Sequence, residues 1–84
     1  MKLIKCLDEF TTISWWNEYR KIANQAINIY NRWQLGQVEG KDAYVVFALS
    51  YMQITNDVNY SEEFDIMKEQ FEFSGFDVSF YHGF

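Results

Sequence analysis

Residues 12–34 of this chain read TISWWNEYRKIANQAINIYNRWQ, and this stretch dominates the fold that we predict. Apolar side chains recur at alternating spacings of three and four, which places them on one face of an α-helix. The stripe consists of Trp16, Tyr19, Ala23, Ala26, Tyr30 and Trp33. The opposite arc is polar and contains Ser14, Asn17, Glu18, Lys21, Asn24, Gln25, Asn28 and Arg32. We expect Thr11 or Thr12 to cap the start of this long amphipathic helix and Gly36 to end it.

The composition is that of a small folded domain. The chain has 84 residues, of which 49% are apolar and 20% aromatic. This apolar content offsets the ordering entropy that keeps polar chains disordered. The length supports one domain, residues 1–84, and excludes a large enzyme core. The single cysteine excludes the small secreted proteins that internal disulfides stabilise.

Residues 43–54 are apolar without a clear period, so their secondary structure is ambiguous. Val45, Val46 and Phe47 favour a strand. The run is longer than the usual strand, however, and its polar residues fall close to one helical stripe. Asp42 follows Gly40 and is expected to be the N-cap of a helix. We predict a buried second helix, with a central strand as the alternative.

A third helix is predicted to begin at Ser61, its N-cap, and to end at Gly75. Its buried stripe consists of Phe64, Met67 and Phe71. Beyond Gly75, the apolar residues Phe76, Val78 and Phe80 alternate with polar ones, which predicts a C-terminal strand. A lone strand needs a partner, and the N-terminal segment 2–7 is the candidate. The predicted fold class is therefore α+β, mainly helical.

The negative charge is concentrated in the last third of the chain. Residues 1–54 carry five acids and six bases, whereas residues 55–84 carry seven acids and only Lys68 as a base. Four of these acids are spaced three, four and three apart, so they share one face of the third helix. They form what we call the acidic row: Glu62, Asp65, Glu69 and Glu72. Lys68 falls elsewhere on the helix and is expected to leave the row without a neutralising cation, while Ile66 and Phe73 lie beside it.

Catalysis and cofactor binding have little support in the sequence. The one histidine, His82, lies close to the chain end, and its pairing with Cys6 would lack a third orienting group. We expect Cys6 to be a small buried residue. Residues 57–63 begin like a calcium-binding loop but lack its glycine and its final glutamate. The glycines form no phosphate-binding loop. We therefore predict neither an enzyme nor a metal or cofactor site.

The acidic row instead favours a protein partner with a basic surface, as nucleic-acid-processing proteins have. Direct nucleic-acid binding is disfavoured because carboxylates repel phosphates. We expect a cytoplasmic inhibitor that occludes such a surface by contacts through Glu62, Asp65, Glu69, Glu72, Ile66 and Phe73. Anti-CRISPR proteins, nuclease-immunity proteins and phage host-takeover factors are of this size and charge. The alternative is a non-catalytic homo-oligomeric or adaptor module that uses aromatic residues for a protein interface. No membrane partner is expected, and the protein is predicted to be a monomer or homodimer.

Overall fold

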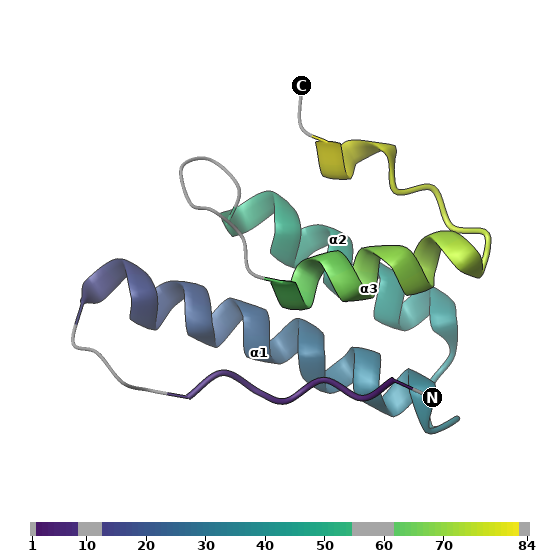
Figure 1. Cartoon of the computed structure of the whole chain (residues 1–84), viewed down its shortest axis with the longest axis horizontal. Helices are drawn as coiled ribbons and strands as arrows, with labels where there is room; N and C mark the ends of the chain where they lie inside the picture. Colours follow the sequence, from purple (N-terminus) through teal and green to yellow (C-terminus); the bar gives the residue numbers. More distant parts are fainter. Residues whose placement is uncertain (1, 9–12, 55–61, 83–84) are drawn as a thin grey trace.

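The computed structural model describes residues 2–8, 13–54 and 62–82. These residues form three α-helices, namely α1 (Ser14–Gln34), α2 (Gly40–Ile54) and α3 (Glu62–Phe73), followed by the short 3-10 helix η1 (Ser79–His82). Figure 1 shows α1 along one side, with α2 and α3 packed above it and the N-terminal segment running beside α1. None of the described residues forms a β-strand. The predicted α+β fold class is therefore wrong, and the observed fold is all-helical.

Helix α1 is the amphipathic helix that the apolar spacing predicts, but it begins at Ser14 rather than Thr12. Ile13 occupies the N-cap position without a side-chain cap, and Thr11 and Thr12 lie outside the described residues. Its end at Gly36 is as predicted. The Gly36 amide donates to the carbonyl of Trp33 at 2.9 Å, and the Gln37 amide donates to that of Arg32 at 2.8 Å. This Schellman motif requires the positive φ of 75° that glycine adopts without steric cost.

Residues 43–54 lie in helix α2, so the strand alternative is wrong. The helix starts earlier than predicted, at Gly40, and Asp42 lies within its first turn rather than at the N-cap. The Glu39 carbonyl accepts hydrogen bonds from the amides of Asp42 and Ala43, at 3.1 and 3.3 Å. Gly40 lies so close to Trp33 that a Cβ atom there would come within 3.0 Å of the indole nitrogen. This approach brings the start of α2 against the end of α1.

The predicted C-terminal strand is instead an extended segment that docks by its side chains. Val78 is buried, and the Phe76 ring stacks on Tyr44 at a centroid distance of 4.9 Å. The Tyr44 hydroxyl donates to the backbone carbonyl of Asp77 at 2.6 Å, and the Ser79 amide donates to the Asp77 carboxylate at 2.9 Å. The alternation therefore predicted which side chains face the core. The strand pairing that it also predicted is absent from the described residues, because helix surfaces offer aromatic contacts but no row of free backbone groups.

The N-terminal segment is extended but does not pair with the C-terminal one. Asn31 of α1 accepts from the Ile4 amide and donates to the Ile4 carbonyl, both at 2.8 Å. Asn24 does the same for Leu7, at 2.8 and 3.1 Å. Three extended residues rise about 10 Å, which matches seven helical residues. Residues 2–8 therefore run antiparallel to α1 as a strap that two asparagine side chains hold (Figure 1).

The core lies where the three helices meet and is rich in aromatic rings. Tyr19, Tyr30 and Phe64 are buried as predicted, whereas Trp16 is only half-buried at the edge. Trp33 stacks on Phe71 at a centroid distance of 4.8 Å, which joins the end of α1 to α3. The remaining fully buried large side chains are Phe47, Ile27 and Met67. This packing fixes which side of α3 faces solvent.

Candidate protein interface

Helix α3 presents the acidic row on the side opposite to the core. Phe64, Met67 and Phe71 are fully buried, and they anchor α3 against α1 and α2. Each member of the acidic row is exposed. The row covers ten helical steps and is therefore about 15 Å long. Glu62 and Asp65 belong to the first turn, where the helix dipole favours carboxylates.

Lys68 does reach the acidic row, contrary to the prediction. Its ammonium nitrogen lies 3.7 Å from a carboxylate oxygen of Glu72, in an i, i+4 pair. An ion pair of this kind on a helix surface contributes only about 0.3–0.5 kcal/mol. It nevertheless lowers the negative field at the C-terminal end of the row. Glu62, six residues away, is the member of the row farthest from Lys68 along the chain.

The two apolar residues predicted beside the row differ in exposure. The Phe73 side chain is 82% exposed at the end of α3, more than any other large apolar side chain among the described residues. Ile66 is half-buried. Burying the side chain of an exposed phenylalanine contributes about 2–3 kcal/mol of favourable free energy. Phe73 is therefore the apolar feature of this surface that most favours a covering partner.

The segment after α3 adds a fifth carboxylate that the sequence analysis did not select. Gly75 has a φ of 93°, and the Phe76 amide donates to the Phe71 carbonyl at 3.0 Å, so the chain turns back at this point. Hydrogen bonds from the backbone and side chain of Ser79 lower the pKa of the Asp77 carboxyl below its usual value. Asp77 and Glu72 line the same cavity of about 350 Å³, together with Phe76, Val78 and Ser79. The acidic surface therefore extends past α3, and only the turn at Gly75 creates this proximity.

Helix α2 carries an apolar surface that the sequence analysis also missed. The prediction of a buried helix is only partly right, since Val45, Leu49 and Met52 are each about half exposed. Ser50, which the polar stripe would have placed outward, is buried. The spacing of four and three residues among the exposed members is a helical stripe. That spacing was the available signal, but the surrounding apolar residues concealed it.

The residues considered for chemistry do not form a site in the described part of the chain. Cys6 is exposed rather than buried, because it lies on the strap between the two residues that the asparagines hold. The side chain of His82 and residues 57–61 lie outside what is described. Within residues 2–8, 13–54 and 62–82, no three His, Cys, Asp or Glu side chains gather closely enough to hold a metal ion. The helices described here include none with the length and apolar character needed to cross a membrane.

Comparisons with known proteins add no relative to this description. Protein-family models, curated proteins and solved structures give no match to the chain. Two surfaces of the described residues are candidates for binding, the acidic one on α3 and the apolar one on α2.

Proposed function

We propose that this protein is a small binding protein that docks its acidic α3 surface on a basic surface of a nucleic-acid-processing protein and inhibits it by occlusion. The observation that carries the proposal is the exposure of all four members of the acidic row beside an 82% exposed Phe73. Carboxylates in such a row imitate the regular negative charge of a nucleic-acid backbone. A protein site that binds phosphates presents Lys and Arg side chains to which these carboxylates are complementary.

The charge distribution supports fast association. Residues 55–84 hold seven acids and one base, so the field is strongest around α3 and the C-terminal segment. A concentrated field of one sign steers an oppositely charged partner and raises the association rate by one or more orders of magnitude. Long-range steering of this kind falls as salt rises, because the screening length is about 8 Å at 0.15 M.

The apolar residues beside the row are expected to slow dissociation of the complex rather than to speed its association. Aromatic anchors at the centre of an interface mainly slow dissociation, since their burial is lost only when the complex opens. Phe73 is positioned for this role, and the half-buried Ile66 lies about two turns away on the same side of α3. In this mechanism the carboxylates control how quickly the complex forms, and Phe73 controls how long it lasts.

The test compares two variants that lose the same number of negative charges at different places. The row variant combines Glu62→Gln, Asp65→Asn, Glu69→Gln and Glu72→Gln. The control variant combines Asp8→Asn, Glu18→Gln, Glu39→Gln and Asp42→Asn. All eight carboxylates are exposed, so both variants should fold.

The partner is isolated from cell lysate with the wild-type protein as bait, and association rates are measured by surface plasmon resonance at low and physiological salt. We expect a loss of roughly tenfold or more for the row variant and less than about threefold for the control. Phe73→Ser should raise the dissociation rate at least about tenfold, whereas Trp15→Ser on α1 should not. Equal association rates for both charge variants, or rates that do not depend on salt, would refute the proposal.

A further inference from the structure

Helix α2 is apolar on both of its sides, although only one of them packs in the core. Phe47 and Tyr51 face α3, with ring centroids 5.7 and 6.4 Å from that of Phe64. On the outer side, Val45, Leu49 and Met52 remain 51%, 52% and 56% exposed. A helix that is apolar all round is normally buried on all sides. The outer side of α2 therefore has the character of a surface that another molecule covers.

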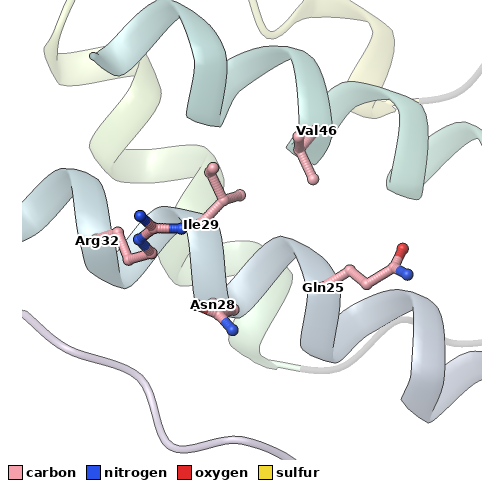
Figure 2. A pocket seen from close by; sticks show the side chains of 5 residues that line it. All are labelled: Gln25, Asn28, Ile29, Arg32 and Val46. Carbon is pink, nitrogen blue, oxygen red and sulfur yellow. The ribbon is translucent and has the colours of Figure 1, made fainter. Parts of the chain in front are cut away.

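The adjoining surface of α1 is a polar stripe that runs the length of the helix. Its members are exposed and recur at helical spacings: Glu18, Lys21, Gln25, Asn28 and Arg32. An open groove of about 340 Å³ joins the two helices (Figure 2), where Ile29 points toward α2 and Val46 points toward α1. Gln25, Asn28 and Arg32 form the α1 edge of this groove. We call the apolar stripe, the polar stripe and the groove together the α1–α2 face.

We infer that the α1–α2 face binds a second copy of this chain in an antiparallel, two-fold arrangement. A two-fold contact requires each stripe to be complementary to its own reversal. The midpoint of the α2 stripe falls between residues 48 and 49, beside Leu49, and the midpoint of the α1 stripe is Gln25. Reversal about these points brings Val45 opposite Met52 of the second copy.

The two midpoints lie at the same level, so one axis serves both helices. Gly40 at the start of α2 abuts Trp33 near the end of α1, and the two helices run antiparallel. Nine residues forward from Gly40 is Leu49, and nine residues back from Trp33 is Asn24, the neighbour of Gln25. A single axis across both helices therefore brings each stripe onto its own copy.

The charges on the face are complementary under the same reversal. Glu18 and Arg32 stand at opposite ends of the polar stripe, about 21 Å apart by helical rise. In the dimer, Glu18 of each copy would lie opposite Arg32 of the other copy, which gives two ion pairs. The polar stripe holds two bases and one acid, so the face lacks the negative excess of α3 and its approach to a copy is not repelled. The acidic row stays outside the interface, and the inference does not depend on the proposed function.

The size of the face fits a reversible dimer. Helix α1 is about 31 Å long, and two packed helices are about 20 Å wide. Because α2 is shorter, at about 22 Å, the footprint is about 500 Å² on each copy, or about 1,000 Å² in total, which is the lower limit for a specific interface. We expect a dimer whose population depends on concentration in the micromolar range.

Sedimentation velocity over a concentration series tests the inference. The wild-type chain of 10.1 kDa should sediment as twice that mass at the upper concentrations and dissociate on dilution. Leu49→Glu should weaken the dimer at least about a hundredfold, because it places a carboxylate on the symmetry axis against its own copy. The matched control is Leu3→Glu, since Leu3 is also 52% exposed but lies on the strap. It should leave the dimer unchanged. A wild-type chain that remains monomeric throughout, or equal effects of the two variants, overturns the inference.

A charge exchange tests the antiparallel register separately. Glu18→Arg or Arg32→Glu alone should weaken the dimer about tenfold, because each single reversal opposes like charges across the interface. The double variant restores opposite charges and should return the dimer to within about threefold of wild type. Within one chain the two residues are too far apart to compensate each other directly. Additive weakening in the double variant overturns the two-fold arrangement.

Discussion

The strap provides the sharpest test of the fold, because identical substitutions on one helix should have opposite effects. Asn24→Ala removes two hydrogen bonds to Leu7, and Asn31→Ala removes two to Ile4. Asn28→Ala is the matched control at dilutions where the chain is a monomer, since Asn28 lies on the same helix but is exposed there. In all three variants alanine improves the intrinsic helix propensity by up to about 0.7 kcal/mol.

The expected loss of stability follows from the number of hydrogen bonds that each variant removes. A protein hydrogen bond contributes about 0.5–1.5 kcal/mol net. The four bonds here are partly buried, so the lower half of that range applies, and each asparagine contributes about 1–2 kcal/mol. Relative to Asn28→Ala, each strap variant should melt roughly 4–16 °C lower, since 1 kcal/mol corresponds to about 4–8 °C in a domain of this size. The double variant should lose less than the sum, because both residues hold the same segment.

Amide hydrogen exchange locates the effect. Ile4 and Leu7 amides should be protected in the wild-type protein, because both donate to asparagine side chains. Asn31→Ala should release the Ile4 amide first, and Asn24→Ala the Leu7 amide first. Thermal unfolding followed by circular dichroism supplies the stabilities. If all three variants melt together, or if exchange at Ile4 and Leu7 is the same in each, the asparagine strap is wrong.

Five further substitutions test the core and the turn at Gly36. Burial raises the pKa of Tyr30 to about 12, and its hydroxyl has no hydrogen-bond partner among the described residues. At pH 7, Tyr30→Phe should therefore leave the free energy of unfolding unchanged or raise it by up to about 1 kcal/mol. In the unfolded chain Tyr30 loses its proton near pH 10, so the wild-type protein loses stability between pH 10 and 12. Urea unfolding should show a smaller loss over this range in Tyr30→Phe, which has no proton to lose. Phe64→Ala should lower the free energy of unfolding by about 3–5 kcal/mol. Trp16→Ala should lower it less, because Trp16 is half-buried and stacks on Tyr19 at the edge of the core. Equal losses in chemical unfolding would contradict this. Gly36→Ala should lower the free energy of unfolding by about 1–2 kcal/mol through the positive φ alone, since nothing lies within 4 Å of an added Cβ. Gly36→Asn should cost less in the same measurement. A Gly36→Ala variant as stable as wild type would argue against the Schellman motif at the end of α1.

Local periodicity determined much of this protein. The three-four spacing of aromatic and small residues predicted α1, and the same spacing of Phe64, Met67 and Phe71 predicted both α3 and the exposure of its acidic row. The glycine ends of α1 and α3 were predictable because a residue with positive φ is a local requirement. The alternation of Phe76, Val78 and Phe80 even predicted which side chains turn inward.

Tertiary structure decided what those segments pack against. Asn24 was predicted to lie on the solvent-facing arc of the first helix, although its seven-residue spacing from Asn31 matches three extended residues of the strap. The two extended ends do not pair as a sheet. The asparagines of α1 bind the backbone of the strap, and aromatic rings of α2 pack against the C-terminal segment. The outward side of α2 depended on where α1 and α3 approach it, and the ion pair between Lys68 and Glu72 depended on side-chain placement around α3. Periodicity specifies which faces a segment has, whereas the partner of each face depends on contacts between residues far apart in the chain, which no local pattern encodes.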